Sequence, residues 1–199
     1  FGAQSVGLSF LDISTGEFLV AQGTAEYVDK LLAGFAPKEV LVRQGMRPRF
    51  EGLYGAKNFV FELEDWAFAP QTAHDKLTRH FQVKNLKGFG VEQYLLALCS
   101  AGALIFYLEQ TQHVGLRNIC SISRIDEGKF VWMDRFTVRN LEIFESASGR
   151  DGVSLVDTID RCCSPMGARL LRSWLSMPVM DLGELGSRFD TVQFFVDHE

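Results

Sequence analysis

The chain has 199 residues, of which 47% are hydrophobic and 12% aromatic, and its formal net charge is −5. This composition excludes an intrinsically disordered chain, and the length fits one large domain or two small ones. The acidic balance weighs against autonomous nucleic-acid binding, which needs an excess of Lys and Arg. The chain begins at Phe1 rather than Met and ends within a helical pattern at Glu199, so we expect an excised piece of a longer protein.

The first part of the sequence alternates between strand and helix patterns. Ser5–Asp12 and Glu17–Ala21 are typical of a β-hairpin, because Gly16 supplies the permissive backbone of a tight turn. The patterns that follow predict a helix at Ala25–Phe35, a strand at Glu39–Val42, a loop with at most one helical turn at Arg43–Lys57, a strand at Asn58–Leu63, a polar helix at Pro70–Phe81 and a long helix at Val91–Thr111. A hairpin followed by a helix and further strands indicates a mixed α/β sheet.

One apolar stretch could be mistaken for a membrane span. Tyr94–Leu108 contains 15 residues and is bracketed by Glu92 and Glu109. Crossing a bilayer takes about 20 apolar residues, so a helix buried inside a protein fits this stretch better. There is also no signal-peptide pattern at the N-terminus. We therefore expect no membrane association.

Four cysteines are present, and none has the C-x-x-C spacing of a zinc or redox site. Cys162 and Cys163 are adjacent, and neighbouring Cα atoms lie closer together than a disulfide prefers. Cys99 and Cys120 are isolated. We expect reduced thiols in a cytoplasmic protein, with no cofactor and no metal in this piece.

The character of the sequence changes between Gln112 and Gly128, and we place a domain boundary at the turn that ends this stretch, with one domain over 1–127 and another over 128–199. The second part predicts a short strand at Phe130–Met133, a helix at Asp134–Leu141 capped by Asp134, a loop at Ser146–Gly152, a segment at Ser154–Asp160 that leads to the next helix, and a last helix at Leu182–His198. In that last helix, Leu185, Phe189, Val192 and Val196 share one side.

The stretch Ser164–Pro178 predicts the helix around which this second part is organised. Ser164 can cap it, Pro165 suits its first position, and Pro178 ends it. At helical spacing the residues separate into an apolar half and a polar stripe. The apolar half contains Met166, Leu170, Leu171, Trp174, Leu175 and Met177, and the stripe contains Arg169, Arg172, Ser173 and Ser176. Trp174, like Trp66 and Trp132, is expected to be a core or interface anchor.

Carboxylates in an α/β domain that starts with a hairpin raise the hypothesis of a metal-dependent nuclease. Asp12 would be the first ligand, with Glu39, Asp65 and Glu92 as conceivable partners. Nothing in the spacing brings these together, and a carboxylate at a strand end more often accepts from the N–H groups of its own turn. No phosphate-binding loop is present either, since Gly128-Lys129 has no Gly-rich stretch before it.

Four strings, in order along nearly the whole chain, resemble the MutS family of DNA mismatch-recognition ATPases. They are LDISTGEF (Leu11–Phe18), GFGVE (Gly88–Glu92), MDRFTVRNLEIFES (Met133–Ser146) and SPMGARLLRSWLSMP (Ser164–Pro178). The last fits the family pattern T/S-P-M-G-x-R-x-L-x-x-W-L-x-x-P. The resemblance implies an RNase H-like α/β connector domain over 1–127, to which no nuclease activity is attributed, and the mainly α-helical beginning of the core or lever domain over 128–199.

The resemblance also implies what this piece does in its parent. The connector would join the mismatch-sensing region to the ATPase region in a structural and allosteric role, without enzyme activity of its own. ATP and Mg²⁺ would bind elsewhere in the parent, and mismatched duplex DNA would be held by domains outside this chain. Arg135, Arg139 and Arg150 are therefore expected to be solvated or paired rather than DNA contacts. The parent is expected to be a homodimer.

In MutS proteins a connector helix helps to dock the downstream factor MutL, and it corresponds to Thr72–Arg79 here. Ala73, Leu77 and Phe81 would anchor this helix. The outward residues, and so the expected MutL contacts, would be His74, Asp75, Lys76 and Arg79. Asp75 and Lys76 stand where some relatives carry a Gln pair, so this sequence departs from the family at those positions. Two alternatives remain open, an RNase H-like metal-dependent nuclease and a generic helical adaptor.

Overall fold

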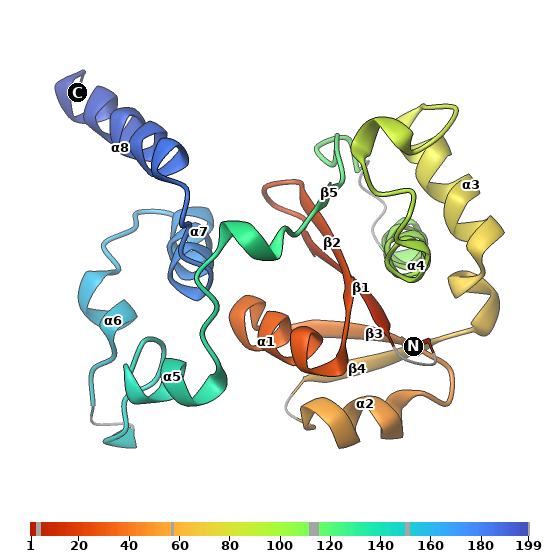
Figure 1. The fold of residues 1–199 in the computed structure, drawn as a ribbon, viewed down its shortest axis with the longest axis horizontal. Helices are drawn as coiled ribbons and strands as arrows, with labels where there is room; N and C mark the ends of the chain where they lie inside the picture. Colours follow the sequence, from red (N-terminus) through yellow and green to blue (C-terminus); the bar gives the residue numbers. More distant parts are fainter. Residues whose placement is uncertain (3–4, 57, 112–115, 150–151, 199) are drawn as a thin grey trace. The chain divides into compact units, whose positions relative to one another are not determined.

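The computed structural model describes residues 1–199 except 3–4, 57, 112–115, 150–151 and 199, and of 127 and 135 it describes the backbone only. The chain divides into two compact units, Phe1–Ile125 and Asp126–Glu199. Each unit has its own secondary structure, which Figure 1 shows as strands and helices in the first and helices in the second.

The first unit is a mixed α/β domain, which confirms the predicted fold class. Its hairpin pairs antiparallel, a third short strand joins it in parallel, and two further strands form a separate parallel pair. The elements in chain order are β1 (Val6–Asp12), β2 (Glu17–Gly23), α1 (Ala25–Phe35), β3 (Glu39–Arg43), α2 (Arg47–Tyr54), β4 (Phe59–Leu63), η1 (Asp65–Phe68), α3 (Pro70–Phe81), η2 (Lys87–Phe89), α4 (Leu95–Thr111) and β5 (Ser123–Arg124).

Helix α4 forms the centre of this unit and is buried, as the sequence predicted. Ala97, Ala101 and Ile105 are fully buried, and α4 packs against β1 and β2 and against α3 (Figure 1). Among the residues that the structure describes, no helix has both the length and the apolar character that a membrane crossing requires. The stretch that looked like a membrane span is the buried core helix of the first unit.

Glycines allow α4 to approach both neighbours closely. A Cβ at Gly7 of β1 would lie 2.1 Å from the carbonyl carbon of Leu96, and a Cβ at Gly102 of α4 would lie 2.4 Å from the Cα of Ala73 in α3. The N-terminus of α4 is capped from β2, where Gln22 Oε1 accepts from the N–H of Leu96 at 2.9 Å. These contacts position α3 on the outer side of α4.

The segment Arg43–Lys57 forms more structure than the predicted loop. It contains α2, which buries Phe50 and Tyr54 one turn apart. Glu62 of β4 accepts from the N–H of Gly45 at 2.9 Å and from that of Arg47 at 3.3 Å. The prediction was wrong because this acceptor comes from a strand that follows later in the chain, and a Gly- and Arg-rich sequence shows no local cap.

The second unit is helical. Its elements are η3 (Glu127–Lys129), α5 (Arg135–Asn140), α6 (Leu155–Ile159), α7 (Pro165–Ser176) and α8 (Leu182–Asp197). Helices α5, α7 and α8 confirm the three helices predicted for this part, and the short helices η3 and α6 were not predicted. Asp134 caps α5 by accepting from the N–H of Thr137 at 2.7 Å, as predicted. The predicted strand at Phe130–Met133 is wrong, because Phe130 makes only an isolated antiparallel bridge with Val179. Pro178, beside that partner, has no N–H to extend a ladder.

Helix α7 begins as predicted, with Pro165 in its first turn and Ser164 Oγ accepting from the N–H of Gly167 at 3.1 Å. Its packing differs from the prediction. Leu170 remains 47% exposed and Trp174 36% exposed, whereas the buried residue within the helix is Ser176 of the polar stripe. Trp174 is therefore not buried in a core among the described residues, and its expected role as an interface anchor stays a prediction.

Helix α8 shows the same behaviour. Its predicted apolar side is present, but Phe189, Val192 and Val196 are more than half exposed. The guanidinium of Arg188 in α8 lies 4.5 Å from the ring centroid of Trp174 in α7. A cation over an indole face is a favourable contact, so the two helices meet partly through charge and aromatic surface.

Candidate docking surface on helix α3

Helix α3 has well-defined ends. Pro70 stands in its first turn, where a missing N–H costs nothing. At the other end Gln82 adopts a left-handed conformation, with φ 55°. The N–H of Gln82 then donates to the carbonyl of Arg79 at 3.3 Å, and the N–H of Val83 donates to that of Thr78 at 3.0 Å. This pair of bonds satisfies the last carbonyls of the helix and turns the chain sharply.

The inner face of α3 packs on α4 through the residues that the sequence indicated. Ala73 and Leu77 are 1% and 0% exposed. Phe81 is partly buried, and its ring lies 4.9 Å from the ring of Phe89. All three predicted anchors therefore face the core of the first unit, which holds the helix in place and leaves its opposite side toward solvent.

The outer face carries three of the four residues expected to contact a partner. Arg79 is exposed, and the side chains of His74 and Asp75 are 44% and 59% exposed. Asp75 Oδ1 accepts from Gln71 Nε2 at 2.9 Å and lies 3.8 Å from His74 Nδ1. The outer face is thus polar and of mixed charge, and these contacts of Asp75 are with side chains of the same helix.

Lys76 lies differently from the other three. Its ammonium pairs with the carboxylate of Glu109 in α4 and lies 5.5 Å from the ring centroid of Phe106. Its side chain is 24% exposed. Lys76 therefore helps to fasten α3 to α4, and the sequence could not show this because Glu109 is 33 residues away.

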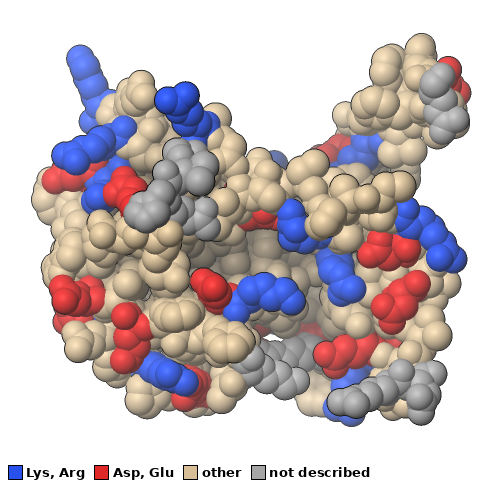
Figure 2. Space-filling model, turned by 180° about the vertical axis from the view of Figure 1, so that it is seen from behind, with Lys and Arg blue, Asp and Glu red and all other residues tan. Residues whose placement is uncertain are grey.

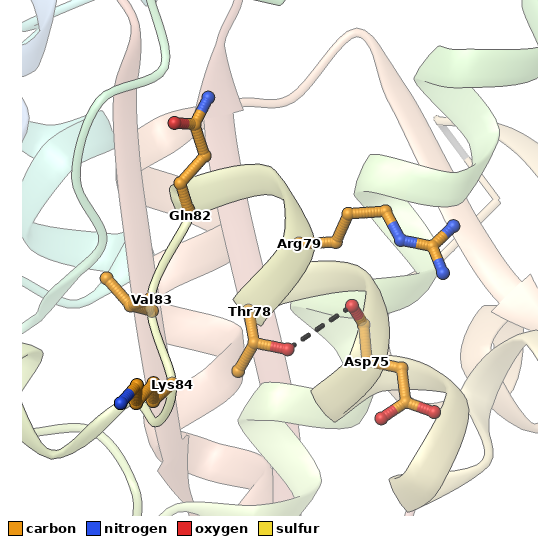
Figure 3. A pocket seen from close by; sticks show the side chains of 6 residues that line it. All are labelled: Asp75, Thr78, Arg79, Gln82, Val83 and Lys84. Carbon is orange, nitrogen blue, oxygen red and sulfur yellow. Dashed lines mark hydrogen bonds between the residues drawn. The ribbon is translucent and has the colours of Figure 1, made fainter.

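A shallow hollow of about 450 Å³ lies at the C-terminal end of α3. Figure 3 shows its lining side chains spreading from the last turns of the helix and from the segment after it. The lining residues are Asp75, Thr78, Arg79, Gln82, Val83 and Lys84. Sequence reasoning missed the last three, because the left-handed Gln82 brings the following residues back beside the helix and only a Gly or Asn would have signalled such a turn.

The carboxylates considered for a nuclease do not converge. Asp12 Oδ1 accepts from the N–H of Ser14 at 2.8 Å and from that of Thr15 at 3.4 Å, so Asp12 stabilises its own hairpin turn. Asp65 lies 3.6 Å from Arg43, and Glu39 bonds Tyr107. Burial, together with Glu39, raises the pKa of Tyr107. Within the described part of the chain, no group of three or more His, Cys, Asp and Glu side chains is placed to hold a metal ion.

Of the three arginines weighed as DNA contacts, the structure describes the side chain of Arg139. Arg139 is exposed in the last turn of α5, Arg150 lies outside the described residues, and the side chain of Arg135 is not described. On the face that Figure 2 shows, Lys and Arg are interspersed with Asp and Glu, and neither sign forms a continuous patch. Among the described residues drawn there, the charges thus show no basic track of the kind that follows a phosphate backbone.

The chain thus consists of a mixed α/β unit with a polar helix on its surface, followed by a helical unit. Comparison with known proteins identifies its class: the family model for MutS domain II matches residues 1–119, and the model for MutS domain III matches residues 136–199. The chain belongs to the MutS family, which confirms the resemblance read from the four sequence strings.

Whole-chain relatives agree with the two domain models. Proteins described as DNA mismatch repair protein MutS are 51% identical in Phocaeicola vulgatus and 50% identical in Bacteroides thetaiotaomicron, each over 98% of this chain. A relative with the same description in Cytophaga hutchinsonii is 46% identical over the whole chain. The chain spans only 22% of the length of the first two relatives and 23% of the third.

Proposed function

We propose that this chain serves as the connector and the beginning of the core of a mismatch repair protein, and that α3 is its docking surface for a MutL-type partner. In this role the first unit links a mismatch-sensing region to an ATPase region. The observation that carries the docking proposal is the division of α3 into two faces. Ala73 and Leu77 are buried against α4, while Asp75 and Arg79 are exposed beside an open hollow.

The contacts within α3 refine which residues meet the partner. Asp75 and Arg79 lie one helical turn apart on the outer face and both line the hollow. His74 is half exposed beside Asp75. Lys76 belongs to the same surface but acts mainly as a tether to Glu109. Since these exposed residues are charged and polar, the partner would present charged and polar groups to them. Such contacts at the edge of an interface affect mainly the rate and the specificity of association.

The remaining expectations concern the longer parent protein. We propose that the parent binds ATP and Mg²⁺, recognises mismatched duplex DNA through regions outside this chain, and acts as a homodimer. These follow from family membership, which the two domain models support. The mixed charge of the first unit fits a structural role, because binding to phosphates would require a concentrated positive surface.

The docking proposal is tested by a double charge reversal in the parent, Asp75→Lys with Arg79→Glu, which leaves the net charge unchanged. Recruitment of the MutL-type partner to mismatched DNA, measured by pull-down, should weaken by about tenfold, because two rim contacts become repulsive. Mismatch affinity and ATP turnover should be unchanged. The matched control is Glu26→Lys with Lys30→Glu on the exposed side of α1, which has the same spacing and the same charge balance.

Two outcomes would overturn the docking proposal. Recruitment that is undiminished in the α3 variant would move the docking surface elsewhere, and equal loss in the α1 control would show that any charge reversal has this effect. The nuclease alternative gains no support from the geometry, because Asp12 is occupied by its own turn. A generic helical adaptor does not account for the matched domain II model over the α/β unit.

A further inference from the structure

Two adjacent cysteines in the second unit have no part in the proposed docking function. Cys162 and Cys163 lie in the short segment between α6 and α7, and both are exposed free thiols. The other two cysteines differ from this pair, since Cys99 is buried and Cys120 is exposed but isolated in the sequence. An exposed pair of neighbouring thiols can act together on one ligand, which a single thiol cannot.

The structure holds Cys162 in a defined place. Its N–H donates to Asp160 Oδ1 at 3.0 Å, and its thiol donates to the same carboxylate. A Cβ at Gly167 would lie 3.4 Å from the Cβ of Cys162 and 3.5 Å from its Sγ, so the Cys162 side chain lies against the first turn of α7. The Asp160 hydrogen bond, with burial and the charges of Asp160 and Cys163, raises the pKa of the Cys162 thiol.

The pair is poorly suited to a disulfide between its own two sulfurs. Consecutive Cα atoms are about 3.8 Å apart, whereas disulfides prefer roughly 4.4–6.8 Å. A single atom bound to both sulfurs enlarges the ring and removes that restraint. Thiolates are soft ligands, so the bridging atom should itself be soft and thiophilic.

We propose that Cys162 and Cys163 form a chelating dithiol site for trivalent arsenicals. In the binding step an arsenoxide R–As=O reacts with both thiols. Two As–S bonds form, the As=O bond breaks, and its oxygen leaves as water with the two thiol protons. Arsenic remains trivalent, so no oxidant or reductant is needed. The Asp160 carboxylate, which bonds the Cys162 thiol, is placed to relay that proton to the departing oxygen and is itself regenerated.

The position of this site gives its occupancy a structural consequence. Ser164, the next residue, is the N-cap of α7 and accepts from the N–H of Gly167. A ligand bridging the two preceding sulfurs restricts the backbone immediately before that cap. The site therefore lies where a bound arsenical acts directly on the start of α7.

The test uses phenylarsine oxide with the folded 199-residue chain at neutral pH, and measures the retained adduct by intact-mass spectrometry after a wash with excess monothiol. Chelation by two sulfurs should retain one arsenical per chain, and 2,3-dimercaptopropanol should remove it. Cys162→Ser and Cys163→Ser should each lower retention about 100-fold or more, because the second As–S bond is no longer intramolecular. Cys120→Ser is the matched control and should retain the arsenical fully.

Circular dichroism on each variant verifies that the helices are formed before retention is compared. Loss of the adduct from the wild-type chain in the monothiol wash would overturn the proposal. So would full retention in either Cys162→Ser or Cys163→Ser. Loss of retention in Cys120→Ser with both adjacent cysteines present would place the site elsewhere and would also overturn it.

Discussion

Helices α4 and α7 are both marked as apolar by the sequence, but they are buried to very different degrees. In the first unit α4 fully buries Ala97, Ala101 and Ile105, whereas α7 in the second unit leaves Met166 and Leu170 about half exposed, at 51% and 47%. Helix α4 contacts β1, β2 and α3. Within the described residues, no comparable surface covers the apolar side of α7. An apolar pattern therefore indicates which side can be buried, and packing partners decide whether it is.

We expect close packing to contribute more to the stability of the first unit, and local interactions to contribute relatively more in the second. Each fully buried aliphatic side chain contributes roughly 1.5–3 kcal/mol. In the second unit the hydrogen bonds of the caps are prominent, such as the reciprocal bonds between Ser154 and Asp157 at the start of α6. Each cap contributes about 1 kcal/mol.

The largest difference is expected from matched truncations of α4 and α7. Ile105→Ala should lower the free energy of unfolding by about 2–5 kcal/mol, because a cavity forms in a packed interior. Leu170→Ala should cost less than about 1 kcal/mol, because half of that side chain already contacts water. Urea unfolding of the two variants measures both values. Equal losses would show that α7 is as well covered as α4 and would remove the contrast.

Glycine replacements should have opposite signs in the two units. Gly7→Ala places a Cβ against the backbone of α4 and should cost about 3 kcal/mol, because a backbone cannot move aside as a side chain can. Gly186→Ala in α8 meets open space and should stabilise its helix by about 0.5–1 kcal/mol. Thermal unfolding of both variants gives the signs. A tolerated Gly7→Ala would mean that β1 and α4 are not closely packed.

Capping residues should distinguish long-range from local stabilisation. Gln22 caps α4 from 74 residues away, while Asp181 caps α8 by accepting from the N–H of Glu184 at 2.8 Å. Replacing either by Ala should cost about 1 kcal/mol. Amide hydrogen exchange should show which region each variant destabilises. Gln22→Ala should increase exchange in α4 together with β2, whereas Asp181→Ala should increase it only in the first turn of α8. Exchange that spreads through the second unit after Asp181→Ala would show cooperative packing there.

A smaller effect concerns pH. Hydrogen bonds from the Ser154 side chain and backbone lower the pKa of Asp157 below its ordinary value of 3.8. The stability from this carboxylate is therefore present above that value and is lost as the pH falls through the lowered folded-state pKa. The unfolding midpoint of Asp157→Asn should lie below that of the wild type at neutral pH. This difference should shrink toward the acid end of a pH series.

Glu17 in the first unit serves as a control, because its contribution to stability should depend on pH in the opposite direction. Desolvation, and then the neighbouring Asp12 carboxylate, raise the pKa of Glu17 above its ordinary value of 4.5. Its stabilising contribution is present in acid and is lost as the pH rises through the raised folded-state pKa. Glu17→Gln should therefore gain stability relative to wild type as the pH increases. The same pH trend in both variants would contradict the assigned causes.

Local sequence signals predicted those elements whose ends are encoded nearby. The starts of α5 and α7 follow from Asp134 and Ser164, which accept from backbone N–H groups three residues on. The start of α3 and its inward residues Ala73 and Leu77 likewise follow from Pro70 and from helical spacing. These features depend on interactions within one or two turns, and so they are visible in the sequence.

The sequence by itself therefore determined the family, the mixed α/β class, the buried character of α4 and the two faces of α3. The tertiary structure alone decided that α2 forms on an acceptor supplied by Glu62, that Lys76 turns toward Glu109, and that Gln82 completes the hollow. It also decided that Trp174 stays partly exposed. In each case the physical reason is the same. The hydrogen-bonding group or the apolar surface that decides the outcome belongs to a distant part of the chain. Periodicity shows which side chains share a face of a segment, but it does not show what packs against that face.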